Sequence, residues 1–273
     1  MINSLIDVDK IDYLVRDSVH CGVEYGKGID VERLMDALYV GADHNRVCLN
    51  EKGRSAVLSI LTCRNIMYQE VYWHKTVRAC DSMFKRLFYH FVERTGQQGI
   101  AALFDCADDE FMLRIFNETK TKPQLQGLAA PFVSRGRQLY KQAYVYSTLG
   151  SASEMSDTQR FFSRVIKQDS YRRMVELSTE LCSRLQRICP DIQPLDIIVD
   201  RAPVKTGGER YYIEGLQIWN TRRKRWENHP PEVLHLNEYL ASTQQAYITC
   251  HPKYYQRLNR LNAEEWNGLL TGL

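Results

Sequence analysis

The segment DVDKIDYLVRDSVHCG, from Asp7 to Gly22, carries the clearest structural and functional pattern in this chain. At helical spacing its polar side chains fall in one row along a single face, and these are Asp9, Tyr13, Arg16, Asp17 and His20. A carboxylate, a phenol, a guanidinium and an imidazole are costly to bury without a partner. The row therefore indicates either a helix face that binds a polar ligand or a solvated face held by pairs within the helix.

A second segment, CRNIMYQEVYWHKTVRACDSMFKRLFYHF from Cys63 to Phe91, has the same character in its first half. Polar side chains again recur at helical spacing, and they are Arg64, Tyr68, Tyr72 and Lys75, with His74 beside them. Its later turns carry instead an apolar stripe made of Cys80, Phe84, Leu87, Phe88 and Phe91. We therefore predict that the later turns of this helix pack in the core and that the polar side chains of its earlier turns form a functional site.

The first segment reads D-x-D-K-x-D-Y-x-x-R-D-x-x-x-x-G and the second contains R-N-x-x-Y-x-x-V-Y-x-H-K-T. Together the two patterns resemble the HD-domain deoxynucleoside triphosphate triphosphohydrolase-like family. Weaker similarity continues into LDIIVDRAP, which begins at Leu195, and YITCHPKYYQRL, which begins at Tyr247. These two stretches look like the small mixed subdomain that often ends such proteins.

The resemblance implies roles for four residues of the first segment. Asp9 would be a ligand of a divalent metal, for which Mg, Mn, Fe and Zn are all compatible with a carboxylate. Lys10 would contact a phosphate. Tyr13 and Asp17 would hydrogen-bond the sugar of a deoxynucleotide, since an Asp accepts a hydroxyl proton that a phosphate cannot offer.

The resemblance implies a second set of contacts from the later segment. Arg64 would clamp the polyphosphate, and Tyr72 would pack against the sugar, where it could select against a 2′-hydroxyl. His74 and Lys75 would lie close to the phosphates or to the base. Tyr68 departs from the His that the vertebrate enzyme of this family has there. The other two members of the first row, Arg16 and His20, are expected to tie their helix to its neighbours.

The family's metal is held by an upstream His, a His-Asp pair and a later Asp, and only the last of these has a counterpart here, Asp9. The chain contains no His-Asp dipeptide, and its histidines are His20, His44, His74, His90, His229, His235 and His251. The sequence thus resembles the C-terminal part of such a protein. Four origins are compatible with this: a split-gene product, a truncation, a chain with a misassigned start or a degenerate relative. We expect a metal only in a site completed by other residues, and no turnover from this chain alone.

Two hypotheses for the function follow. In the first, the chain is a portion or subunit of a metal-dependent phosphohydrolase that acts on deoxynucleoside triphosphates, with the missing helices supplied by another chain. In the second, it is a nucleotide-binding or assembly module without catalysis. Helices that lack their packing partners expose apolar surface, so we expect a homo-oligomer or a partner chain that supplies the N-terminal half.

Composition narrows the class of protein. The chain has 273 residues, of which 44% are hydrophobic, and a net charge of +3, so no global excess of positive charge favours nucleic acid as a partner. Its eight cysteines form no CxxC pair, which is typical of a reduced cytoplasmic protein. No segment reaches the roughly 18 apolar residues of a membrane span.

The basic turn TRRKRW, Thr221 to Trp226, could bind phosphates or RNA, but a solvated loop between strands is the favoured interpretation.

The predicted fold is mainly α, α+β overall: a helical HD-domain-like core over residues 1–190 and a small α/β subdomain over 191–273 packed on it. A β-hairpin is expected between Leu38 and Gly53, and Asp30 is the expected N-cap of the helix before it. One long helix is predicted from about Gly53 to Arg94, with a break near Cys63. Three strands are predicted after Pro190, followed by one or two closing helices; these strands are LDIIVD, RYYIEGLQIW and QAYITC.

Overall fold

The fold is described here from a computed structural model, which places residues 8–40, 47–119, 122–133, 138–147, 156–167, 170–202, 216–227 and 245–273. The chain forms two compact units, and each is a discontinuous stretch of sequence. Unit 1 comprises Met1–His74 and Pro203–Thr243, and unit 2 comprises Lys75–Ala202 and Gln244–Leu273. Within the described ranges, no helix is both long and apolar enough to span a bilayer.

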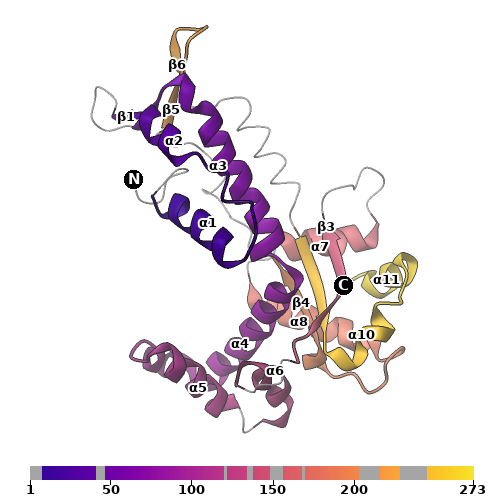
Figure 1. The fold of residues 1–273 in the computed structure, drawn as a ribbon. Helices are drawn as coiled ribbons and strands as arrows, with labels where there is room; N and C mark the ends of the chain where they lie inside the picture. Colours follow the sequence, from indigo (N-terminus) through magenta and orange to yellow (C-terminus); the bar gives the residue numbers. More distant parts are fainter. Residues whose placement is uncertain are drawn as a thin grey trace. The chain divides into compact units, whose positions relative to one another are not determined.

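Unit 1 is built from short helices and a small sheet (Figure 1). In chain order its helical elements are α1 (Val8–His20), α2 (Val31–Ala37), η1 (Glu51–Gly53), α3 (Arg54–Met67) and the π-helical turn η2 (Tyr68–Tyr72). Its strands are β1 (Leu38–Val40), β2 (Val47–Leu49), β5 (Leu216–Asn220) and β6 (Arg225–Glu227). The predicted cap of α2 is confirmed, since the Asp30 side chain accepts a hydrogen bond from the Arg33 amide at 2.9 Å.

The sheet of unit 1 has the strand order β1-β2-β5-β6. β1 and β2 are antiparallel, as the hairpin prediction requires, and the turn between them lies outside the described residues. β5 runs parallel to β2 and antiparallel to β6. The predicted strand RYYIEGLQIW was assigned to a C-terminal subdomain. That assignment is wrong, because the described part of this segment lies in β5, which pairs with β2 in the sheet that begins at Leu38.

The core of unit 1 forms between α1, α2, α3 and this sheet. Its fully buried members include Leu14, Leu34, Leu49, Ile60 and Leu61. α1 is also fixed by the loop that follows it, since the buried Ser18 hydroxyl accepts from the Gly26 amide at 2.8 Å. The same hydroxyl donates to the Val23 carbonyl oxygen at 2.9 Å. The loop is thereby held tightly against the polar helix.

Unit 2 contains the longer helices and a second sheet (Figure 1). Its helical elements are α4 (Lys75–Leu103), α5 (Asp108–Thr119), α6 (Pro123–Val133), α7 (Asp157–Lys167), α8 (Tyr171–Leu185), η3 (Pro194–Asp196), α10 (Pro252–Leu258) and α11 (Ala263–Leu270). Its strands are β3 (Lys141–Ser147), β4 (Ile197–Arg201) and β7 (Gln245–Cys250), antiparallel throughout in the order β3-β7-β4. The expected strand at LDIIVD and the expected strand at QAYITC are both confirmed.

Buried polar groups join α4 to the sheet of unit 2. Arg78, which is 1% exposed, forms an ion pair with the equally buried Asp200 of β4 and donates to the Arg201 carbonyl oxygen at 2.7 Å. Arg86 donates to the Ser178 hydroxyl of α8 at 2.8 Å. Breaking a buried pair of this kind leaves an uncompensated charge, so the network fixes the register of α4 on the sheet.

One expectation about the long helix needs correction. The helix does not break near Cys63 but after η2, where the Trp73 amide bonds to the Tyr68 carbonyl oxygen five residues back at 2.7 Å. That wider turn ends the first helix at Tyr72, and α4 starts separately at Lys75. The predicted end near Arg94 is confirmed, because Gly96 takes non-helical dihedrals, φ 61° and ψ −155°, which separate two helical segments within Lys75–Leu103.

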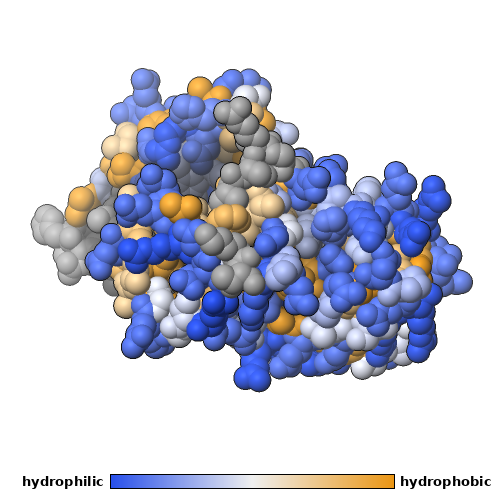
Figure 2. Space-filling model, turned by 90° about the horizontal axis from the view of Figure 1, so that it is seen from below, coloured by the Kyte–Doolittle hydropathy of each residue, from blue (hydrophilic) through white to orange (hydrophobic). Residues whose placement is uncertain are grey.

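The compact units also divide the chain elsewhere than at the expected boundary between residues 190 and 191. The reason lies in the strand pairing. β3 precedes that boundary and β7 follows it, yet the two strands pair along their whole length. The overall class, mainly α with small sheets, is confirmed. On the face of the described residues seen in Figure 2, hydrophobic groups are scattered among mainly hydrophilic ones.

The loop after α1 generates a prediction about stability. A Cβ added at Gly26 would overlap the Leu14 carbonyl oxygen, whereas one added at Gly28 would meet nothing. Gly26→Ala should therefore lower the free energy of unfolding by about 1 to 3 kcal/mol, as overpacked sites do, and Gly28→Ala should leave it nearly unchanged. Urea denaturation of both variants measures this, and equal stabilities would contradict the close approach of the loop to α1.

Candidate functional site

One hydrogen bond joins the two polar helices of unit 1. The Tyr72 hydroxyl, at the end of η2, donates to Asp17 Oδ2 on α1 at 2.8 Å. The ring of Tyr13, one turn earlier on α1, meets the Tyr72 ring edge-on with 6.3 Å between centroids. The two helices thus lie against each other through three of the residues that the sequence singled out.

Arg64 brings a positive charge to this cluster. It lies in the last turn of α3 and is only 5% exposed. Its guanidinium carbon lies 5.5 Å from the centroid of the Tyr68 ring, in a cation–π arrangement. It also contacts the Tyr13 side chain. A guanidinium held between aromatic rings keeps its planar set of donors oriented, which suits recognition of a phosphate.

Tyr13 and Tyr72 are protonated at neutral pH, as free phenols are, and burial raises their pKa values further. Burial raises the pKa of Tyr13 to about 12, against an opposing effect of the nearby Arg64. The pKa of Tyr72 is also raised, first by burial and then by its hydrogen bond to Asp17. At neutral pH both hydroxyls are therefore neutral groups that can donate a hydrogen bond. The site combines a carboxylate, two neutral phenols and one fixed cation.

The π-helical turn η2 gathers further aromatic rings beside these groups. The ring of Tyr68 lies 5.0 Å from that of Tyr72 and 5.6 Å from that of Trp73. Such turns inside helices occur frequently at functional sites. Trp73 was missed in the sequence, where only polar spacing was followed, although the adjacent Tyr72-Trp73 pair was a usable signal.

The remaining predicted site residues lie at the ends of these elements. Asp9 is exposed and Lys10 half-buried, both in the first turn of α1. His74 is exposed and follows η2, while the exposed Lys75 begins α4 and belongs to unit 2. Helical spacing places Asp9 on the same face of α1 as Tyr13 and Asp17. The contacts that join α1 to α3 and η2 thus involve four of the eight predicted residues: Tyr13, Asp17, Arg64 and Tyr72.

Arg16 and His20 do not behave as expected. Arg16 pairs with Asp12 and Asp17 of its own helix, the latter at 3.6 Å between Nε and Oδ1. His20 is exposed at the end of α1. The ion pairs of Arg16 therefore stabilise α1 itself rather than tying it to a neighbouring element.

The described part of the chain holds no group of three or more His, Cys, Asp or Glu side chains that could bind a metal ion. Asp9 is thus a single carboxylate in an exposed first turn. A catalytic metal needs about three protein ligands. The residues that the structure describes do not fit a complete metal site.

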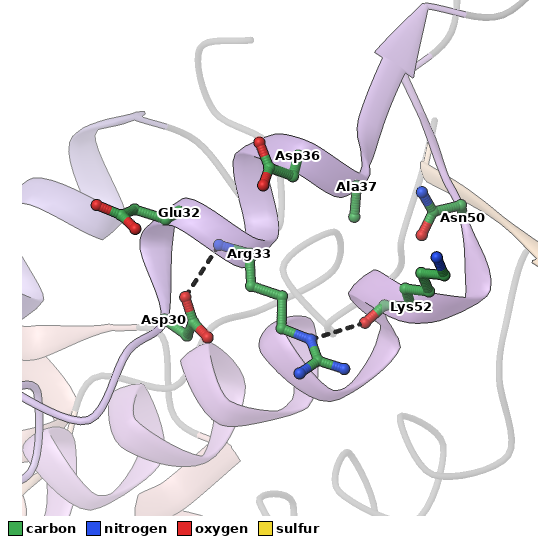
Figure 3. A pocket seen from close by; sticks show the side chains of 7 residues that line it. All are labelled: Asp30, Glu32, Arg33, Asp36, Ala37, Asn50 and Lys52. Carbon is green, nitrogen blue, oxygen red and sulfur yellow. Dashed lines mark hydrogen bonds between the residues drawn. The ribbon is translucent and has the colours of Figure 1, made fainter.

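A separate pocket of about 560 Å³ lies between α2 and η1 (Figure 3). Its lining residues carry both signs of charge and are Asp30, Glu32, Arg33, Asp36, Ala37, Asn50 and Lys52. Within it, Arg33 Nε donates to the Lys52 carbonyl oxygen at 3.2 Å. None of the predicted site residues lines this pocket, so its volume is no guide to the cluster on α1.

Residues 29–203 match the model of the HD-associated region. The chain belongs to this family. Human deoxynucleoside triphosphate triphosphohydrolase SAMHD1 is 25% identical over 204 residues, which are 71% of this chain and 31% of the human protein. YwfO of Bacillus subtilis is 33% identical over 89 residues, which are 33% of this chain and 20% of YwfO. This chain therefore covers less than a third of the length of these curated relatives.

Two solved structures share the fold. A hypothetical protein from Aquifex aeolicus superposes with a TM-score of 0.53 at 17% identity, over 92% of this chain and 56% of that one. A phosphohydrolase from Bacteroides thetaiotaomicron gives a TM-score of 0.52 at 17% identity, over 92% and 62%. At this identity the likeness shows the fold alone.

The bond between Tyr72 and Asp17 yields a prediction that a double-mutant cycle can measure. Tyr72→Phe and Asp17→Ala should show a coupling energy of about 1 to 2 kcal/mol, because the bond has a charged acceptor and is half-buried. Urea denaturation of the two single variants and the double variant gives this value.

The matched control is the pair Tyr89 and Glu93, which makes the same type of bond at 2.8 Å within the single helix α4, on an exposed face. Its coupling should be only a few tenths of a kcal/mol. Additive effects of the Tyr72 and Asp17 substitutions would show that α1 and η2 are not joined through these groups.

Proposed function

We propose that this chain forms the sugar- and phosphate-binding part of an HD-domain phosphohydrolase that acts on deoxynucleoside triphosphates. The observation that carries the proposal is the hydrogen bond from Tyr72 to Asp17, at 2.8 Å, which unites two segments 55 residues apart. If the two polar helices were merely solvated, their polar side chains would have no reason to meet. If they form one binding face, these side chains are expected to lie together, as Tyr72 and Asp17 do.

The sugar contacts follow from the acceptor and donor set. Asp17 Oδ2 accepts from the Tyr72 hydroxyl, while Oδ1 lies 3.6 Å from Arg16 Nε in a side chain that is 31% exposed, and a carboxylate oxygen can accept more than one hydrogen bond. A ribose or deoxyribose 3′-hydroxyl is a suitable donor for this carboxylate. The ring of Tyr72 would then lie against the sugar, where a 2′-hydroxyl would meet an aromatic edge without a hydrogen-bond partner.

The phosphate contacts come from two cations on different elements. Arg64 offers a planar guanidinium that can bind two phosphate oxygens at once, and Lys10 offers a compact ammonium in the first turn of α1. Tyr13 is a neutral donor beside Arg64, since its pKa lies near 12. The family resemblance assigns further contacts with the phosphates or the base to His74 and Lys75, whose side chains are both exposed.

The metal enters this proposal only through Asp9. When bound, a divalent cation would polarise the phosphate and supply a water nucleophile. Asp9 would contribute one carboxylate, and the described part of the chain holds no group of three or more His, Cys, Asp or Glu side chains that could bind the metal. The role that we assign to this chain is therefore to bind and orient the nucleotide, and a homo-oligomer or a partner chain would complete the metal site.

Arg64→Gln tests the phosphate contact. The substitution should raise the dissociation constant for dGTP roughly tenfold to a hundredfold, because a charge-assisted hydrogen bond contributes on the order of 1.5 to 3 kcal/mol. Since Arg64 is buried, Lys10→Gln on α1 provides a second variant with little effect on packing, and it should weaken binding in the same direction. Isothermal titration of the 273-residue chain measures both.

Arg222→Gln/Arg225→Gln removes two exposed charges of unit 1 far along the sequence and should leave dGTP affinity unchanged. A dissociation constant for dGTP that is the same in the wild type and in both site variants would contradict the proposal.

The proposal also predicts that the chain by itself releases triphosphate from dGTP only at the background rate, with Mg²⁺ or Mn²⁺ present. One carboxylate does not hold a metal that normally needs three or four protein ligands. Robust turnover that Asp9→Ala abolishes would contradict this, because it would require a different ligand set within the same sequence.

A further inference from the structure

The hairpin formed by β5 and β6 carries a cationic tip. Asn220 and Arg225 pair across its end, and the turn between them is closed by the Arg223 amide, which donates to Asn220 Oδ1 at 2.9 Å. Lys224 adopts a left-handed φ of 46°, so the turn has a defined conformation. Figure 1 shows the tip of this hairpin projecting beyond the other described elements of unit 1.

Four consecutive cations form the tip: Arg222, Arg223, Lys224 and Arg225, and all four are exposed. The neighbouring carboxylate is Glu227, which pairs with Arg223 at 3.1 Å and approaches Arg225 Nε at 3.9 Å. Among the residues that the structure describes, Arg222 and Lys224 make no ion pair with a carboxylate. The tip therefore keeps a net positive charge, which attracts anionic partners.

Aromatic rings line the outer face of the same sheet. Ile218 points into the core of unit 1, so its neighbour Trp219 points to the opposite face. Trp219 and Trp226 are directly paired, with ring centroids 5.1 Å apart, and the Tyr39 ring of β1 lies 5.6 Å from that of Trp226. Trp226 is 37% exposed and Tyr39 is 40% exposed. Large ring surfaces thus remain open to solvent directly behind the cationic tip.

We propose that this outer face and the cationic tip bind single-stranded nucleic acid. Cations that track the phosphates, next to rings on which unpaired bases stack, are the two elements of sequence-tolerant single-strand recognition. A duplex hides the faces of its bases and cannot use the rings. A membrane-inserting hairpin would carry apolar residues at its tip, whereas residues 221–224 are polar or charged. The function is separate from nucleotide binding on α1.

The charged tip is tested with Arg222→Gln/Lys224→Gln and a fluorescein-labelled dT12 oligonucleotide, followed by fluorescence anisotropy. We expect binding at least tenfold weaker, and a slope of log affinity against log salt that is smaller by about 1.4, from roughly 0.7 per lost phosphate contact. The matched control is Lys167→Gln/Arg172→Gln, which removes the same charge from exposed positions of unit 2 and should change neither quantity.

The stacking face is tested with Trp226→Leu, which should weaken dT12 binding about fivefold to a hundredfold. Binding of dT12 should also quench the fluorescence of a Trp266→Phe variant as in the wild type, because Trp266 is buried in unit 2. The proposal is overturned if dT12 binds equally well to the tip variant, if a duplex of the same length binds as tightly as dT12, or if vesicles of anionic lipid displace the oligonucleotide.

Discussion

The hydrogen bond from Tyr72 to Asp17 is the interaction on which the arrangement of unit 1 depends. It joins the start of the chain to the end of α3, and the rings of Tyr13 and Tyr68 pack around it. In a regular α-helix each backbone amide donates to the carbonyl oxygen four residues earlier. In η2 the donor and acceptor are five residues apart, which widens the turn at Tyr72. From the other side, the loop at Gly26 is bonded to Ser18, so α1 is held at both of its faces.

Electrostatics explain why this cluster is better suited to a ligand than to stability alone. Arg64 is almost fully buried in a setting of phenols, where a cation retains little hydration. The phenols of Tyr13 and Tyr72 carry no charge at neutral pH, and the negative charge within this set of contacts comes from Asp17, which is partly exposed. A guanidinium and a partly exposed carboxylate side by side match a phosphorylated sugar, which offers acceptors at one end and hydroxyl donors at the other.

Local sequence patterns predicted the parts of this fold that depend on local physics. The polar row of α1, the Asp30 cap, the hairpin of β1 and β2 and the strands at β4 and β7 follow from spacing and capping alone. The break after Tyr72 was placed too early, because a π-helical turn has no Pro or Gly to mark it. Strand partners were not predictable: β5 pairs with β2 across more than 160 residues, and β3 with β7, so the domain boundary expected at 190/191 differs from the compact units. Of the predicted site residues, the structure brings together Tyr13, Asp17, Arg64 and Tyr72, whereas the packing of Trp73 on Tyr68 depends on the π-helical turn, which polar spacing does not predict.

The most direct measurement is a crystal structure of the full chain with dGTP bound. The account predicts the triphosphate between Lys10 and Arg64, the 3′-hydroxyl on Asp17 and the sugar against the Tyr72 ring. Density for the nucleotide only in the pocket between α2 and η1, with the bond between Tyr72 and Asp17 absent, would contradict it.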